Sequence, residues 1–165
     1  MSLRLSPEQF ERLASKAKGG KQKPPRYQAT EDAEQIALFA WVDIVTPRAP
    51  QLEYLFHPPM GGLRDPQVGA QLKAMGARAG INDLILIWPS RGFGGLMAEL
   101  KVAGNDLEPE QRIWQARAEA VGWHVATYYG WVAAALGLCW YLDLNLNLMG
   151  LDSVSLGVAH YGSQQ

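Results

Sequence analysis

The sequence predicts an α/β domain in which helices alternate with the strands of a central sheet. Its 165 residues, 48% of them hydrophobic, suit one globular domain with a sizeable core. Helix-like and strand-like patterns follow one another in the order α-β-α-β-β-α-β-α. We therefore expect a folded domain at residues 30–142, preceded by a basic, flexible arm at residues 1–29 and followed by a tail at residues 143–165.

The first helix of this domain is expected to begin near Thr30. This residue is a suitable N-cap, and the acidic residues after it favour a helix N-terminus. Pro47 and Pro50 end the helix. Its expected apolar stripe consists of Ala33, Ile36, Ala37, Ala40 and Ile44.

A strand and a second helix come next. Residues 51–57 predict a strand, which the Pro-Pro-Met-Gly-Gly segment at residues 58–62 ends. Pro66 then opens a helix that extends to about residue 77. The apolar residues expected on one side of this helix are Val68, Leu72 and Met75.

The middle of the chain predicts a β-hairpin. Residues 84–88, Leu-Ile-Leu-Ile-Trp, are rich in strand-forming side chains, and the Pro- and Gly-rich residues 89–95 form a turn. Residues 96–102 are expected to return antiparallel to the first strand.

The last elements of the domain are a helix, a strand and a helix. Pro109 can start a helix carrying Ile113, Trp114, Ala118 and Val121, with Gly122 just past its end. Residues 123–128 predict a strand, and residues 131–142 a final helix. In the tail, Leu144, Leu146 and Leu148 alternate as in an edge strand, and this segment is also a possible dimer contact.

Composition argues against several classes of protein. All fifteen Lys and Arg lie in the first 117 residues, together with thirteen of the sixteen acidic residues, which favours a mildly cationic face. The single cysteine excludes an intrachain disulfide and, with only three histidines, disfavours a Cys/His zinc site. Residues 131–142 form the longest apolar run, which is shorter than the ~20 residues of a membrane span, and no secretory signal is evident. We expect a cytoplasmic protein with no membrane role.

Three residues in the hairpin favour hydrolytic chemistry. Glu99 and Lys101 alternate in the second strand, so their side chains project from the same face. Asp83 lies sixteen positions before Glu99, and in a simple hairpin centred on Arg91 it would lie roughly opposite Glu99. Two carboxylates at one end of a sheet suit Mg²⁺ or Mn²⁺, and a neighbouring amine can orient water or offset negative charge.

These residues and their surroundings resemble the signature of the PD-(D/E)XK nuclease superfamily. More narrowly, they resemble the VRR-NUC family, which is the small phage and bacterial type of that superfamily. The resemblance covers about residues 30–142. The matching text is His-Pro-Pro-Met-Gly-Gly at residues 57–62, residues 73–84 up to Asp83-Leu84, residues 95–101 with Glu99-Leu100-Lys101, Glu110-Gln111, and Trp114.

The resemblance implies a restriction-endonuclease-like αβββαβ core, with a mixed central sheet flanked by helices and a bound Mg²⁺ or Mn²⁺. It departs at Met60, where the family has Asn, and at Asn82, where the superfamily nominally has Pro. The implied catalytic residues are Asp83, Glu99, Lys101, Glu34 and Gln111, and the implied metal ligands are Asp83, Glu99, Glu34 and the main-chain carbonyl of Leu100.

Each of these residues also has a purely structural explanation. Asp83 could cap a turn, and Glu99 with Lys101 could be a solvated pair on an edge strand. Glu34 suits the first turns of any helix, and Gln111 suits a capping box. The candidate DNA contacts are His57, which could instead simply end a buried strand, together with Arg64, Lys73, Arg78, Arg91 and the arm at residues 16–26.

The sequence therefore predicts a metal-dependent DNA endonuclease that hydrolyses phosphodiester bonds with metal-activated water. Stand-alone members of the family resemble Holliday-junction resolvases and tend to dimerise, so the resemblance implies a homodimer acting on branched or duplex DNA in a bacterial or phage-infected cell. Two alternatives remain open at this point. One is a catalytically inactive DNA-binding accessory protein with the same fold, and the other is an RNA-directed nuclease of the same superfamily.

Overall fold

A computed structural model describes residues 30–58 and 66–151, together with Ser6, Glu8 and Gln9. The predicted arm at residues 1–29 lies almost wholly outside the described residues, as does the tail beyond residue 151. The chain divides into two compact units. The first comprises Met1–Glu53, Leu100–Asn105 and Thr127–Gln165, and the second comprises Tyr54–Glu99 and Asp106–Ala126.

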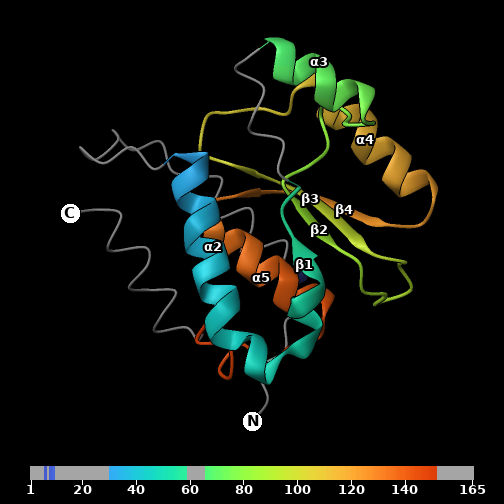
Figure 1. The fold of residues 1–165 in the computed structure, drawn as a ribbon. Helices are drawn as coiled ribbons and strands as arrows, with labels where there is room; N and C mark the ends of the chain where they lie inside the picture. The colour runs from blue at the N-terminus through green and yellow to red at the C-terminus, as the bar shows by residue number, and fades with distance from the viewer. Residues whose placement is uncertain (1–5, 7, 10–29, 59–65, 152–165) are drawn as a thin grey trace. The chain divides into compact units, whose positions relative to one another are not determined.

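The predicted fold class is confirmed, since helices alternate with strands in the expected order. The helices are α2 (Glu31–Val45), α3 (Pro66–Ala74), α4 (Pro109–Ala120) and α5 (Trp131–Tyr141), and two short 3₁₀ helices cover Thr46–Arg48 and Pro50–Tyr54. The strands are β1 (Leu55–Phe56), β2 (Leu84–Leu86), β3 (Leu96–Lys101) and β4 (His124–Tyr129) (Figure 1).

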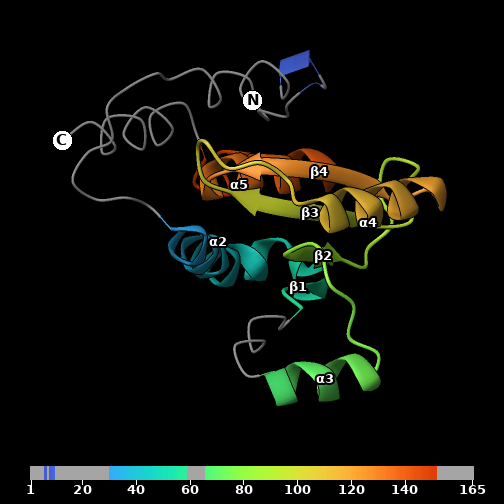
Figure 2. The ribbon, with the colours of Figure 1, turned by 90° about the horizontal axis from the view of Figure 1, so that it is seen from above.

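The four strands form one mixed sheet in the order β1-β2-β3-β4. β1 pairs antiparallel with β2, and β2 pairs antiparallel with β3, as the predicted hairpin requires. β4 runs parallel to β3, because His124 N donates to Gly95 O and Gly130 N donates to Lys101 O, an advance of six residues on both strands. The arrows of β3 and β4 accordingly point the same way in Figure 2.

In the first unit, α2 packs against α5 (Figure 1). Thr30 caps α2 as expected, because its Oγ1 accepts a hydrogen bond from Ala33 N. α5 is almost entirely buried, and burial raises the pKa of the Cys139 thiol within it to about 12. Cys139 is therefore a core residue rather than a reactive one.

The apolar stripe predicted for α2 is wrong. Ile36 and Ile44 are 71% and 69% exposed, whereas the buried residues are Leu38, Trp41, Val42 and Val45. The apolar side chains of this helix lie on more than one of its sides, so periodicity alone could not select the buried side. The stripe that faces the core is instead the one formed by Leu38, Trp41, Val42 and Val45, which are spaced three and four residues apart.

Three other expectations need correction. The strand expected at residues 51–57 is only Leu55–Phe56, because Pro50–Tyr54 forms a 3₁₀ helix that Pro50 favours. α3 ends at residue 74 rather than about 77, and both Val68 and Met75 on its expected apolar side are exposed. No edge strand forms at residues 144–148. Turns there bury Leu146, which the alternating pattern could not reveal.

The described part of the tail is instead fixed to α2. Trp41 Nε1 donates a buried hydrogen bond to the main-chain oxygen of Met149, 2.9 Å away. Met149 is itself buried. Within residues 30–58 and 66–151, no helix combines the length and the apolar character that a membrane span requires.

Candidate active site

The β2–β3 hairpin brings two of the predicted site residues to the same end of the strand pair. Leu84 pairs with Ala98, and Leu86 pairs with Leu96. Asp83 and Glu99 are the residues next to the Leu84–Ala98 pair, and Asp83 lies in a bend just before β2. The hairpin geometry expected from the sequence is therefore present, although it does not by itself test a catalytic role.

A tight turn closes the hairpin, although its Ser90–Phe93 bridge is offset by one residue from the β2–β3 register. Arg91 and Gly92 have φ angles of 51° and 84°, and positive values at both central positions define a type I′ turn, whose twist matches that of paired strands. Hydrogen bonds in both directions between Ser90 and Phe93 close it. The predicted centre at Arg91 is confirmed.

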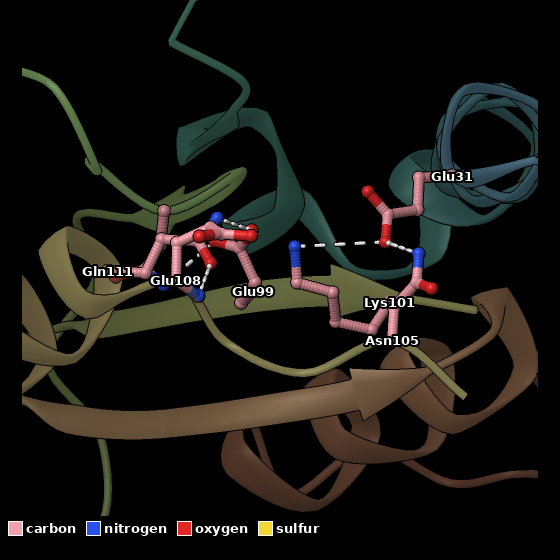
Figure 3. Close-up of polar contacts among 7 residues, drawn as sticks. Glu31, Glu99, Lys101, Asn105, Glu108 and Gln111 are labelled. Carbon is pink, nitrogen blue, oxygen red and sulfur yellow. Dashed lines mark hydrogen bonds and ion pairs between the residues drawn. The ribbon is translucent and has the colours of Figure 1, made fainter. Parts of the chain in front are cut away.

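Glu99 is buried, with a side chain only 1% exposed, and amide groups hold both of its carboxylate oxygens. Asn82 Nδ2 donates to Glu99 Oε2 at 2.9 Å. Gln111 Nε2 donates to Glu99 Oε1 (Figure 3). A buried carboxylate needs such donors, because burial removes its hydration. The two amides therefore fix both the position and the orientation of the Glu99 side chain.

Gln111 connects Glu99 to the start of α4. Its Oε1 accepts from Glu108 N at 2.7 Å, as in a capping box, while its Nε2 serves Glu99. The capping role and the predicted site role are thus combined in one side chain. Trp114 Nε1 also donates to Ala79 O at 3.0 Å, which ties α4 to the segment that leads into Asn82.

His57 acts on the backbone beside Asp83. Its Nδ1 lies 2.8 Å from the main-chain oxygen of Asp83. A carbonyl only accepts, so Nδ1 carries the proton of this hydrogen bond. This contact supplies a structural task for His57, and its predicted contact with DNA stays a prediction.

Lys101 is buried in the first unit, with 6% of its surface exposed. Its Nζ lies 3.7 Å from Glu31 Oε1, which also accepts from Asn105 Nδ2 at 3.0 Å (Figure 3). Sequence reasoning missed Glu31 and chose Glu34 as the important acid of this helix. Both acids lie in the first turn of α2, so helical position did not distinguish them.

Glu34 has a different partner within the first unit. Its Oε2 accepts a hydrogen bond from Trp131 N at 2.7 Å, at the N-terminus of α5. A carboxylate is favourable there because the first main-chain N–H groups of a helix have no partner within the helix. The predicted metal role of Glu34 stays a prediction.

The predicted DNA contacts are only partly covered by the described residues. Lys73, Arg78 and Arg91 are exposed, as a contact with phosphate requires. Arg64 and the Met60-Gly61-Gly62 segment lie outside the described residues. Most surface cations are simply solvated, so the exposure of these side chains does not distinguish a DNA contact from an ordinary surface position.

Few of the described polar side chains are buried. Among the described residues, the buried polar or charged ones are Asn82, Glu99 and Lys101. Glu99 and Lys101 are predicted catalytic residues. Asn82 had no predicted role, although it stands where the superfamily nominally has proline. Burial of charged groups is costly and is therefore concentrated at functional sites.

The donor set suits a hard cation. In the part of the chain that the structure describes, no three His, Cys, Asp or Glu side chains cluster as metal ligands would. Asp83 and Glu99 both adjoin the Leu84–Ala98 pair of the hairpin, and the buried Oδ1 of Asn82 has no hydrogen-bond partner among the described residues. Two carboxylates with an amide oxygen fit Mg²⁺ or Mn²⁺, which bind few protein oxygens and retain water.

Comparison with known proteins supports the fold. No protein-family model and no curated protein matches the chain. Among solved structures, the chain is similar to a "VRR_NUC domain protein" at 23% sequence identity. The match covers 72% of this chain and 93% of that chain, with a TM-score of 0.59. At this identity the likeness establishes a VRR-NUC-like fold and nothing further about activity.

Proposed function

We propose that this chain is a divalent-metal-dependent endonuclease that hydrolyses DNA phosphodiester bonds. The observation that carries the proposal is the hairpin register, in which Asp83 and a buried, amide-held Glu99 both adjoin the Leu84–Ala98 pair. Lys101, two residues after Glu99, is also buried. The VRR-NUC-like fold is consistent with this assignment. Ordinary surface pairs would leave Glu99 and Lys101 in water, so burial favours the catalytic explanation over the solvated one.

In the proposed mechanism, Asp83 and Glu99 hold Mg²⁺ or Mn²⁺ together with the main-chain carbonyl of Leu100. Such an ion would supply polarisation of the phosphodiester and a water molecule of lowered pKa. Asn82 and Gln111 keep the Glu99 carboxylate in one orientation, so little reorganisation is needed when substrate binds. Lys101 orients the attacking water and offsets the negative charge that develops on the phosphate.

The test is cleavage of supercoiled, flap and four-way-junction DNA by the purified protein with Mg²⁺ or Mn²⁺. We expect cleavage that EDTA abolishes. Asp83→Asn should reduce the rate by at least ~100-fold while DNA binding persists, since loss of one important transition-state interaction costs roughly 3 kcal/mol. Asp106→Asn changes an exposed aspartate and is the matched control.

Each alternative corresponds to a distinct result. A wild-type protein that binds DNA but cleaves none of these substrates, with Asp83→Asn indistinguishable from it, would identify a binding protein. Cleavage of ribose-containing substrates in preference to their 2′-deoxy equivalents would identify an RNA-directed nuclease. Either result contradicts the proposed function.

We assign branched DNA as the preferred substrate and a homodimer as the acting form, which would place two sites on two strands. The support is the resemblance to stand-alone junction-resolving nucleases. Preferential cleavage of four-way junctions over linear duplex, and a mass of twice 18.2 kDa in light scattering, are the expected results. A monomer with no preference for junctions would contradict this assignment.

A further inference from the structure

Asn82 is the buried polar residue that the proposed mechanism has used least. Its side chain is 0% exposed, and it immediately precedes Asp83. Its Nδ2 donates to Glu99 Oε2 at 2.9 Å. An ionised carboxylate only accepts hydrogen bonds, so this contact determines which end of the amide faces Glu99.

The other end of the same amide has no hydrogen-bond partner within residues 30–58 and 66–151. Oδ1 is buried, and no donor among the described residues reaches it. A buried acceptor without a donor is rare in folded proteins, because it has lost its hydration without compensation. Such an atom points to a ligand that the protein alone does not supply.

A divalent cation is the ligand that fits this position best. Amide oxygens of Asn are ordinary ligands of hard cations, alongside carboxylates and water. The oxygen shares its amide with the nitrogen that holds Glu99, and Asp83 is the next residue. The described residues offer no cluster of three carboxylates, so an amide oxygen would supply a further protein ligand to the ion.

We propose that Asn82 binds the divalent cation through Oδ1, as a third side-chain ligand beside Asp83 and Glu99. This inference rests on the proposed function, because it concerns the same metal site. It assigns two tasks to one amide: Nδ2 orients the Glu99 carboxylate, and Oδ1 coordinates the ion. Proline at this position could do neither through its side chain.

The test is Mn²⁺ affinity, measured by titration calorimetry on the full chain without DNA. Asn82→Leu removes both the donor and the oxygen, and it should weaken Mn²⁺ binding at least ~10-fold, about 1.4 kcal/mol. Asn82→Asp removes the donor but keeps an oxygen and adds a charge. It should bind Mn²⁺ at least as tightly as the wild type.

Gln111→Leu is the matched control, because it also removes one amide donor from Glu99 but takes no oxygen from the site. If Asn82 only positions Glu99, then Asn82→Leu, Asn82→Asp and Gln111→Leu should all weaken binding alike, which overturns the inference. Circular dichroism in EDTA confirms that each variant is folded. If Asn82→Leu does not fold, the contrast between Asn82→Asp and Gln111→Leu decides the question.

Failure of the inference and failure of the proposed function give different results. A wild-type chain that binds Mn²⁺ and cleaves DNA, with Asn82→Leu binding as tightly, overturns the ligand role and leaves the nuclease intact. A wild-type chain that binds no Mn²⁺ overturns both. Weakened binding in Asn82→Leu, with wild-type or tighter binding in Asn82→Asp, supports both.

Discussion

The ion pair between Lys101 and Glu31 distinguishes two neighbouring acids of α2. Glu31 lies 3.7 Å from the amine, whereas Glu34 binds the main chain of Trp131. A buried amine depends on such a partner, since its charged form is no longer hydrated. Glu31 is about one-third exposed, so the interaction is partly screened and its effect on rate should be moderate.

We therefore predict that Glu31→Gln lowers the rate of DNA cleavage by roughly three- to ten-fold, equivalent to about 0.7–1.4 kcal/mol. Glu34→Gln should instead lower the free energy of unfolding by about 0.5–1 kcal/mol, because it removes a charge from the N-terminus of α5. Single-turnover cleavage and urea unfolding measure the two effects. A large loss of Mn²⁺ affinity in Glu34→Gln would instead establish Glu34 as the metal ligand predicted from the sequence.

His124 introduces a dependence of stability on pH. Its ring lies 5.1 Å from the ring of Phe93, and burial lowers its pKa from 6.5, while the nearby Glu119 opposes that shift. The unfolded chain therefore binds a proton at a higher pH than the folded chain does. The stability that neutral His124 contributes is fully present above pH 6.5. It is lost as the pH falls from 6.5 through the lower pKa that His124 has in the folded chain.

We predict that the free energy of unfolding decreases between pH 7.5 and pH 5.5, and that His124→Gln makes this decrease smaller. Urea unfolding of both proteins at the two pH values measures the effect. The comparison with His124→Gln removes the contributions of other titrating groups. An identical pH dependence in the two proteins would show that His124 does not control it.

From motif spacing, sequence reasoning selected Asp83, Glu99 and Lys101 as candidate site residues, and their catalytic roles stay predictions. It could not identify Asn82 or Glu31. The roles of these two residues depend on hydrogen-bond and ion-pair partners that lie 17 and 70 positions away along the chain. A single chain does not show such pairings before it folds.

At the scale of elements, helix and strand identity followed from local signals, whereas buried faces did not. Thr30 and Pro109 marked helix starts correctly, and Arg91-Gly92 form a turn where the sequence predicted one. The exposed Ile36 and Ile44 show where local pattern fails. A helix with apolar residues on several sides is oriented by tertiary packing, which its own sequence does not specify.

The contact between α5 and β4 depends on a glycine. A Cβ at Gly137 would overlap the ring of Tyr128, which is 3% exposed. Alanine normally favours a helix over glycine by about 1 kcal/mol, but overpacking of a core costs about 1–3 kcal/mol. The overlap should therefore outweigh the gain in helix propensity.

We predict that Gly137→Ala lowers the free energy of unfolding by about 1–2 kcal/mol. The loss should become smaller when Tyr128 is first replaced by Leu, because the clash is then relieved. Urea unfolding of the four proteins in this double-mutant cycle measures the coupling. Equal effects in both backgrounds would show that Tyr128 does not limit residue 137.

For the whole molecule, metal binding and folding should be linked, because the site exists only when distant parts of the chain come together. Asn82 and Asp83 precede the hairpin turn, and Glu99 follows it. Gln111 lies in the first turn of another helix, α4. The unfolded chain cannot hold these groups in place. An ion bound only by the folded state stabilises it by about 2.7 kcal/mol at a hundred times its Kd.

We predict that saturating Mn²⁺ raises the Tm of the wild-type chain by roughly 5–10 °C relative to EDTA, since each kcal/mol shifts the Tm of a domain this size by about 2–4 °C. Asp83→Asn should lose most of this rise, whereas Asp106→Asn should retain it. Differential scanning fluorimetry measures all three proteins. The contrast matters because Mn²⁺ bound at scattered surface carboxylates would stabilise both variants equally, and only an ion held by the paired hairpin carboxylates separates them.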